Sequence, residues 1–193
     1  MSEIDCYPSA YGTCQEILSH LHSMKRKCIK EGNYRYLLSI PVADLGTRTL
    51  FILSNPSTAD ENEDDPTTRN LQKWAREQGI SDVVIANLYA YCSSRPGALK
   101  NIPDTEASGS KNDLMIEKAA REVDQVIVAW GNPSSGRERE EFDIRARTLL
   151  SMLLSTHPIV YCVGHLTKDG YPRHPRHWYI AKEQEKRVYK WNL

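Results

Sequence analysis

Side chains that can bind ligands follow the apolar runs of this chain. Asn55 follows the run FILS, Asn87 closes the run VVIAN, and His174 stands in the polar segment beyond the run IVYCV. An amide offers both a donor and an acceptor, and an imidazole donates a hydrogen bond whether neutral or protonated. In open α/β sheets, ligands bind outside the carboxyl ends of the strands. If these runs are parallel strands, we expect the three side chains to converge at one edge.

A loop rich in carboxylates follows Asn55 and contains Asp60, Glu61, Glu63, Asp64 and Asp65. Carboxylates bind sugar hydroxyls through charge-assisted hydrogen bonds. The three aspartates could instead hold magnesium together with His174, as in a metal-dependent nuclease or phosphohydrolase. The simpler interpretation is that the loop is solvated charged surface.

Hydrophobic periodicity predicts the elements that position these groups. Helices are expected over residues 11–30, 67–79, 107–123 and 138–155, with Thr67 or Thr68 and Ser110 as N-caps. Strands are expected over 34–42, 48–53, 83–87, 125–130 and 159–163, the first two paired as a hairpin. Short apolar strands alternating with helices predict a three-layer α/β/α fold with a central parallel sheet.

Length and composition narrow the class of protein. The 193 residues fit a single domain, 1–193, in which 1–47 form a helix and hairpin-strand extension. No run approaches the ~20 apolar residues of a membrane span, and the first residues lack a signal-peptide pattern. We therefore expect a cytoplasmic monomer without membrane contact.

Cysteine usage argues against a metal or disulfide framework. The five cysteines are Cys6, Cys14, Cys28, Cys92 and Cys162. Their count is odd, their spacing is wide and no CxxC occurs, which is typical of free thiols in a reducing compartment. No cofactor, obligatory metal or iron–sulfur cluster is expected.

The formal net charge is zero, which by itself disfavours a nucleic-acid partner. Basic residues nevertheless gather on both sides of the acidic loop, at 25–35 and at 168–190. Basic flanks around an acidic pocket suit a ligand with a charged backbone and a hydroxyl-rich head.

Four blocks, each at the end of a predicted strand, carry a resemblance to a known family. They are LFILSNPS at 50–57, ANLYAYCSSRP at 86–96, VIVAWG at 126–131 and RHP at 173–175. In this order they resemble the motifs of the uracil-DNA glycosylase superfamily. The chain also resembles a bacterial and phage family of unassigned function whose members carry NPSTAD, DDPT, NLxAY, AWG and TKxGxPRHP. The resemblance implies a uracil-DNA glycosylase-like fold and a DNA partner.

The resemblance also implies roles in base excision, in which a nucleotide is flipped out of the stack and its base is removed. His174 stabilises the leaving base, Asn87 reads its edge and Asn55 places the attacking water. Because an amide cannot take the proton, Asp64 or Asp65 is expected to be the general base. Base contacts are expected from Ser57, Tyr89 and Tyr91, and phosphate contacts from Lys168, Arg173 and Arg176.

Departures from the motifs point away from uracil as the substrate. Ser54 replaces part of the usual glycine turn, and Arg176 follows His-Pro where the superfamily has serine. We expect hydrolytic excision of a modified pyrimidine, for example glucosylated hydroxymethylcytosine in phage DNA, as a defence. Lyase chemistry through a Schiff base on Lys168 is the lesser expectation. A metal-dependent nuclease and a non-catalytic nucleic-acid binding module are the competing hypotheses.

Overall fold

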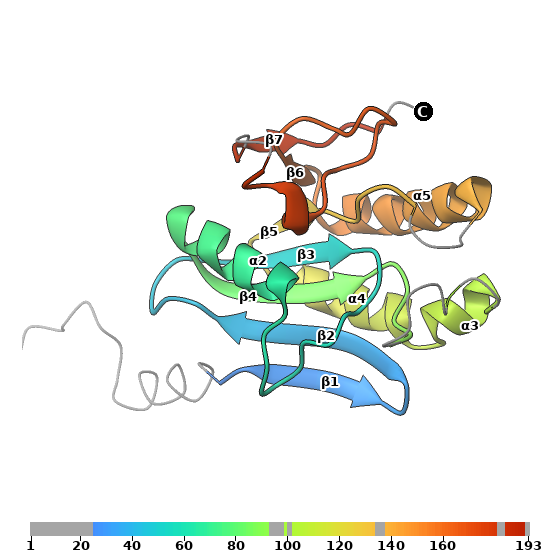
Figure 1. Cartoon of the computed structure of the whole chain (residues 1–193), viewed down its shortest axis with the longest axis horizontal. Coiled ribbons are helices and arrows are strands. Elements are labelled where there is room, and N and C mark those ends of the chain that lie inside the picture. The colour runs from blue at the N-terminus through green and yellow to red at the C-terminus, as the bar shows by residue number, and fades with distance from the viewer. Residues whose placement is uncertain (1–24, 93–98, 100–101, 134–137, 181–183, 192–193) are drawn as a thin grey trace, which may run out of the picture.

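Helices and strands alternate along the chain and build one mixed sheet (Figure 1). The structure, a computed structural model, describes residues 25–92, 99, 102–133, 138–180 and 184–191. The strands are β1 (Lys27–Glu31), β2 (Tyr34–Pro41), β3 (Thr47–Leu53), β4 (Ile80–Asn87), β5 (Gln125–Val128), β6 (Tyr161–Val163) and β7 (Lys186–Val188). The helices are α2 (Pro66–Glu77), α3 (Asp104–Ser108), α4 (Asn112–Arg121), α5 (Arg139–Thr156) and the short 3₁₀ helix η2 (Pro175–His177).

The centre of the sheet is parallel, as predicted. The strand order is β1-β2-β4-β3-β5-β6-β7. Strand β3 pairs in parallel with β4 and β5, and β5 pairs in parallel with β6. The outer strands β1, β2 and β7 are antiparallel to their neighbours, which makes the sheet mixed.

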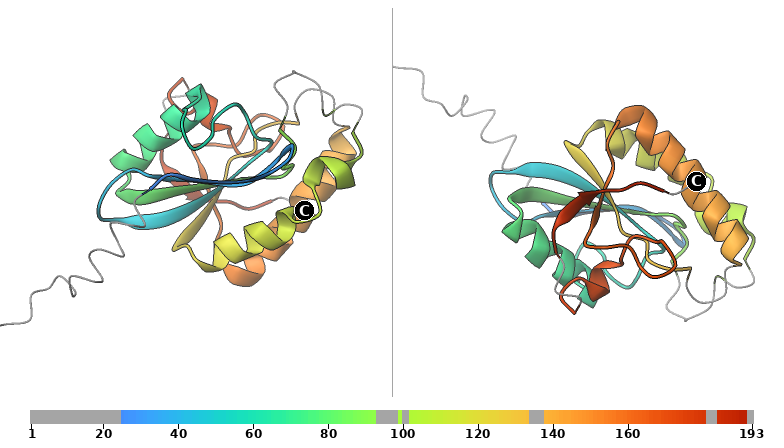
Figure 2. Two further views of the ribbon diagram at one scale, coloured as in Figure 1. Left: turned by 90° about the horizontal axis from the view of Figure 1, so that it is seen from below. Right: turned by 90° about the horizontal axis from the view of Figure 1, so that it is seen from above.

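Helices cover both faces of the sheet (Figure 2). On one face, Phe51 of β3 packs against Trp74 of α2 and Trp178 after η2, at ring distances of 6.1 and 6.4 Å. On the other face, Phe142 of α5 packs against Tyr89 and Tyr171. Since β-strand side chains alternate between faces, the continuous apolar runs fill both cores.

The predicted hairpin between residues 34–42 and 48–53 is wrong, because β4 lies between β2 and β3. The connection crosses the start of β4, where Val42 N donates to the carbonyl of Ser81 (2.8 Å). A Cβ on Gly46 would clash with the carbonyl oxygen of Gly79, so only glycine permits this crossing. Periodicity reveals that a segment is a strand, but not which strand it pairs with.

The helix predicted over 11–30 is also wrong where the structure describes it, because 27–31 form β1. This strand pairs with β2 across a turn in which Gly32 has a φ of +55°. Residues 11–24 of the predicted helix lie outside the described residues.

The helix predicted over 107–123 is interrupted. Gly109, at a φ of +78°, separates α3 from α4, and a Cβ there would lie 2.8 Å from a ring carbon of Tyr34. Ser110 is therefore not an N-cap, and α4 begins after Lys111 without a side-chain cap.

Helix α2 is capped by Asp65 rather than by either predicted threonine. Asp65 Oδ1 accepts a hydrogen bond from Thr68 N (2.7 Å), and Thr68 Oγ1 accepts one from Asp65 N (2.9 Å). Pro66 occupies the first helical position, where its missing N–H costs nothing. This reciprocal capping box fixes the direction in which the acidic loop enters α2.

Sequence patterns do not predict strand β7 or helix η2, because both are too short to show periodicity. No helix of the described residues is both long and apolar enough to cross a bilayer.

Candidate functional site

The strand order places a topological switch point at the carboxyl edge between β3 and β5. The chain leaves β3 toward α2 on one face and leaves β5 toward α5 on the other (Figure 1). Two neighbouring parallel strands whose connections diverge leave a gap at their carboxyl ends, where ligands bind in open α/β sheets. Asn55 stands at the end of β3, and Gly131 follows β5.

Asn87 ends β4 with its side chain completely buried. Its exposure is 0 %, and neither Oδ1 nor Nδ2 has a hydrogen-bond partner among the described residues. In the β3–β4 register it lies beside Leu53. Alternation along β4 places Asn87 on the α2 face with Val83 and Ile85. Buried amides without partners are rare and costly, so this one requires an explanation.

The main chain at Asn87 is held from the opposite face. Asn112 Nδ2 donates to the carbonyls of Asn87 (2.9 Å) and Leu88 (3.2 Å), and Arg145 Nε donates to Leu88 O (2.8 Å). Arg145 is itself fixed by a two-pronged ion pair with Asp113, with Nη1 3.0 Å from Oδ2. These bonds fix the backbone from which the unpaired amide projects.

The structure keeps the imidazole of His174 neutral. Burial lowers its pKa to about 4, assisted by the positive charges of Arg176 and His177. Its Nδ1 accepts a hydrogen bond from Arg176 N (3.3 Å), as the N-cap of η2. Because Nδ1 is the acceptor, the neutral ring carries its proton on Nε2 and can donate it to a ligand.

Gly131 brings His174 to the end of β5. Gly131 N donates to the carbonyl of Pro172 (2.9 Å). A Cβ on Gly131, whose φ is +74°, would lie 3.0 Å from the Cβ of His174. The AWG motif therefore requires glycine at this position, because the segment that carries His174 packs too closely for a larger residue.

Asp65 shares the corner occupied by His174. It is 4 % exposed, and its negative charge acts to raise the pKa of His174 against the stronger effect of burial. Asn70 Nδ2 of α2 donates to Pro175 O of η2 (3.2 Å), which ties the two helices together. Oδ1 of Asp65 caps α2, while its Oδ2 makes no hydrogen bond with a described residue.

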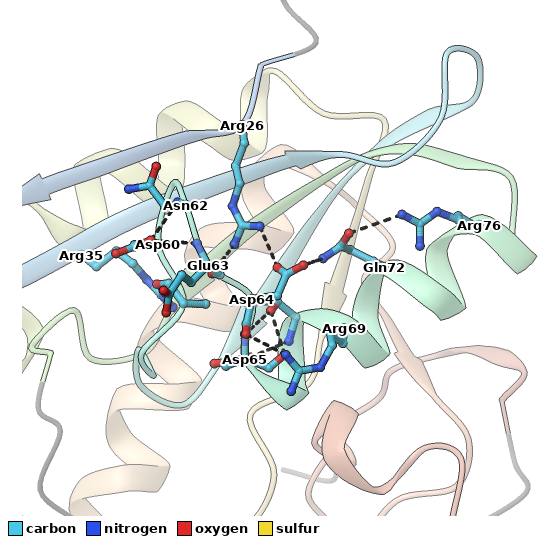
Figure 3. Close-up of polar contacts among 12 residues, drawn as sticks. Arg26, Arg35, Asp60, Asn62, Glu63, Asp64, Asp65, Arg69, Gln72 and Arg76 are labelled. Carbon is cyan, nitrogen blue, oxygen red and sulfur yellow. Dashed lines mark hydrogen bonds and ion pairs between the residues drawn. The ribbon is translucent and has the colours of Figure 1, made fainter.

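Asp64 is directed toward Arg26 and Gln72 (Figure 3). Its Oδ1 pairs with Arg26 Nη1 (2.7 Å), and its Oδ2 accepts from Gln72 Nε2 (2.8 Å). Burial by itself raises the pKa of Asp64, but the hydrogen bonds from Gln72 and Arg26 outweigh it, so the pKa lies below its usual value. A carboxylate with both oxygens engaged and a lowered pKa is a poor general base.

Asp60 shapes the acidic loop instead of lining a pocket. Its Oδ1 accepts hydrogen bonds from Asn62 N (2.8 Å) and Glu63 N (3.1 Å), and these bonds hold its pKa below the usual value. Across the described parts of the chain, no three His, Cys, Asp or Glu side chains are grouped to share a metal ion. The four residues of the alternative magnesium site, Asp60, Asp64, Asp65 and His174, therefore do not converge.

Asn55 and Ser57 lie in the loop after β3. Asn55 is half-buried, and its Nδ2 donates to Pro56 O (3.3 Å), which leaves Oδ1 available for water. The ladder continues past β4, with Leu88 N donating to Leu53 O (2.8 Å), so Asn55 lies beside the end of β4. Ser57 is exposed at the surface of the loop.

The two tyrosines predicted to stack on a base have packing roles. Tyr89 has 0 % exposure and packs against Phe142 on the α5 face, away from Asn87. Tyr91 is half-buried and packs edge-on against Tyr34 at a ring distance of 5.7 Å. Their positions do not support the predicted base contacts.

Two of the three predicted phosphate contacts are exposed, and one of these, Arg176, lies two residues from His174. Lys168 and Arg176 are open to solvent, one in the segment that leads to η2 and one within η2. Arg173 is half-buried, and its Nε donates to the carbonyl of His165 (2.9 Å), so it shapes this segment. Lys168 and Arg176 remain the candidates for phosphate binding.

The described cysteines are free thiols. Burial raises the pKa of Cys162 to about 11, so this thiol is not a nucleophile at neutral pH. Cys6 and Cys14 lie outside the described residues.

Comparison with known protein families gives one match. Residues 35–176 match the family described as "Protein of unknown function (DUF1643)". The chain belongs to the DUF1643 family. The matched range contains all the candidate site residues from Arg35 to Arg176. No curated protein and no solved structure matches the chain.

Sequence patterns miss three residues of the site of this DUF1643 member. Asn112 and Arg145 lie on predicted helices, and nothing local indicates that they reach the end of β4. The third is Arg35, a buried residue of β2 whose Nη1 donates to the carbonyl of Ala59. In the sequence, Arg35 is visible only as a basic residue within the apolar run YRYLLSIPV. Strand periodicity gives no reason to place it in a binding site.

Proposed function

We propose that this protein is a DNA glycosylase that flips a modified pyrimidine out of DNA and hydrolyses its bond to the sugar. The observation that carries the proposal is the fully buried amide of Asn87 at the carboxyl edge, which has no partner among the described residues. A pyrimidine presents a carbonyl oxygen and a ring nitrogen side by side. An amide matches such an edge with one donor and one acceptor, so a bound base would satisfy both atoms of Asn87.

The neutral His174 suits the departing base. A base leaves with negative charge on its ring, and a positioned hydrogen-bond donor stabilises that charge in the transition state. Nε2–H of His174 supplies such a donor, and the low pKa keeps the ring neutral throughout the physiological range. The close approach allowed by Gly131 fixes where this donor stands.

Asp65 is the better candidate for the general base. Asp64 is engaged with Arg26 and Gln72, whereas Asp65 lies in the corner with His174, and its Oδ2 has no hydrogen bond to a described residue. Its carboxylate can take a proton from water, and its negative charge can stabilise the cation-like sugar, as carboxylates do in glycoside hydrolysis. Asn55 Oδ1 can orient that water.

The proposed substrate class rests on the motif departures at Ser54 and Arg176 and on the uracil-DNA glycosylase-like order of the strand-end motifs. We propose a substituted pyrimidine such as glucosylated hydroxymethylcytosine in phage DNA, and a role in defence. Lys168 and Arg176 are exposed, Arg176 two residues from His174, and both supply positive charge for the DNA backbone.

The test incubates the full chain, with EDTA present, on phage DNAs that carry different modified pyrimidines and on uracil-containing DNA. Released bases are identified by mass spectrometry, and abasic sites by alkali cleavage. We expect a free modified base and alkali-labile DNA from the wild type, and neither from Asn87→Ala. The control Asn62→Ala removes an exposed loop amide and should retain activity.

Two further outcomes would reject the proposal. DNA that stays intact in EDTA but is cut once magnesium is added would identify a metal-dependent nuclease. DNA that is bound but never altered, with binding that survives Asn87→Ala, would identify a binding module.

A further inference from the structure

Arg35 is a buried cation beneath the loop that follows β3. It is 3 % exposed, its Nη1 donates to the carbonyl of Ala59, and its Nε has no hydrogen-bond partner among the described residues. Figure 3 shows the side chain reaching from the sheet toward the loop that ends at Asp65. Arg35 thus lies at the same edge as the corner formed by Asp65 and His174.

A β-bulge gives Arg35 this direction. In the pairing of β1 with β2, Ile29 faces Leu37 and Lys30 faces Arg35, so Tyr36 is the extra residue. An extra residue reverses the alternation of side chains on one side of the bulge. The chain therefore directs Arg35 toward Ala59 on the α2 face, which is the face of Asn87.

Among the described residues, the charge of Arg35 has no counter-ion in contact. Arg145, the comparable buried arginine, forms an ion pair with Asp113. No carboxylate of the described residues lies within ion-pair distance of Arg35. Burial lowers its pKa, but an arginine remains protonated in proteins. An uncompensated buried cation is costly unless a bound group supplies negative charge.

We propose that Arg35 contacts the extruded base and stabilises the negative charge that develops on it when the glycosidic bond breaks. This inference rests on the proposed glycosylase function. In the step, the oxygen of water bonds to the sugar C1′ and gives its proton to Asp65. The bond from C1′ to the base N1 breaks, and its electron pair goes to the base, where the charge spreads onto the ring carbonyl. The base anion then takes up one proton from solvent, and Asp65 releases its proton to solvent.

Arg35 supplies what the neutral His174 lacks, a permanent positive charge. Cytosine-type bases form more basic anions than uracil and are therefore poorer leaving groups. A pocket with a fixed buried cation lowers the barrier most for such bases, because the interaction is strongest when the negative charge is fully developed. We therefore infer that substituted cytosines are the preferred substrate class.

The test measures single-turnover rates of base release by the full chain on DNA carrying substituted cytosines or uracil. We expect Arg35→Gln to lower the rate constant on substituted cytosine by roughly 10²–10³-fold, with little change in DNA affinity. Arg35→Lys keeps the positive charge but loses the planar guanidinium group, and should retain an intermediate rate. Millimolar guanidinium should partly restore Arg35→Ala, which a purely structural role would not allow.

The matched control is Arg48→Gln, because Arg48 pairs with Asp82 at the opposite edge of the sheet. A second measurement needs no variant. In the wild type, the rate should depend only weakly on the acidity of the released base across a series of 5-substituted pyrimidines.

The outcomes separate the two proposals. Base release that is unchanged in Arg35→Gln, or that falls steeply in the wild type as the base becomes less acidic, overturns the role of Arg35 and leaves the glycosylase standing. Absence of base release by the wild type from every DNA overturns the glycosylase, and the role of Arg35 with it.

Discussion

Gly131 and His174 approach so closely that a Cβ on the glycine would lie 3.0 Å from the Cβ of the histidine. This contact links the end of β5 to the segment before η2. It is the point at which the central sheet sets the position of the proposed donor to the leaving base.

Gly131→Ala should therefore displace His174. We expect base excision to fall at least tenfold and the free energy of unfolding to fall by about 1–2 kcal/mol, because φ is +74°. Gly170→Ala is the matched control, since Gly170 has a φ of +87° with nothing within 4 Å of a Cβ. Equal loss of activity in both variants would show that backbone strain alone explains the effect. The measurements are base release and urea unfolding.

Asn87→Leu should make the protein more stable and inactive. Leucine has nearly the shape of asparagine and removes two buried polar atoms that lack partners among the described residues. We expect a gain of about 1–2 kcal/mol in the free energy of unfolding and complete loss of base excision. A loss of stability in urea unfolding would mean that the amide is paired in solution, and would argue against an open recognition site.

Asp64→Asn and Asp65→Asn should separate structure from catalysis. Asparagine caps a helix as well as aspartate does, so Asp65→Asn should keep α2 intact and lose the general base. We expect its rate of base release to fall by roughly 10²–10⁴-fold with little change in melting temperature. Asp64→Asn weakens a partly exposed ion pair with Arg26 worth about 1 kcal/mol or less, and should stay active. The reverse pattern would assign the base to Asp64.

The neutral His174 should make stability depend on pH. Its pKa in the folded chain, about 4, lies below the ordinary histidine value of 6.5. The unfolded chain therefore binds the proton first as the pH falls. The neutral His174 therefore contributes up to about 3 kcal/mol to the free energy of unfolding at neutral pH. This contribution is fully present above pH 6.5 and is lost progressively as the pH falls through 4.

Urea unfolding between pH 7 and 4 should show this loss in the wild type and a flatter profile in His174→Gln. NMR titration of the His174 ring gives the pKa directly. A measured value near that of a solvated histidine would contradict the neutral, desolvated imidazole.

Asn112 should act on the site through the backbone of Asn87. Asn112→Ala removes both hydrogen bonds to the Asn87 and Leu88 carbonyls. We expect a loss of about 1–3 kcal/mol in the free energy of unfolding and a lower rate of base release with unchanged DNA affinity. Asn70→Ala, which removes a single bond to Pro175 on the other face, is a milder comparison. Unchanged catalysis in Asn112→Ala would exclude the positioning role.

Local sequence is sufficient to predict the alternation of elements and the polar ends of the strands. The runs that form β3, β4 and β5, the helix α5, and the place of Asn87 at a strand end all follow from local periodicity. Such periodicity is visible because neighbouring side chains of one element share one environment. Local sequence also contains the capping box, although the residue pattern indicates Asp65 as a base and not as a cap.

Which groups meet depends on the tertiary structure alone. It places β4 between β2 and β3 and directs Arg35 inward through the bulge at Tyr36. It also turns Asp64 toward Arg26 and brings Asp65 within electrostatic reach of His174. Each of these depends on contacts between residues far apart in the chain. The free energy that selects them comes from packing and charge pairing across elements, which no local window of the sequence contains.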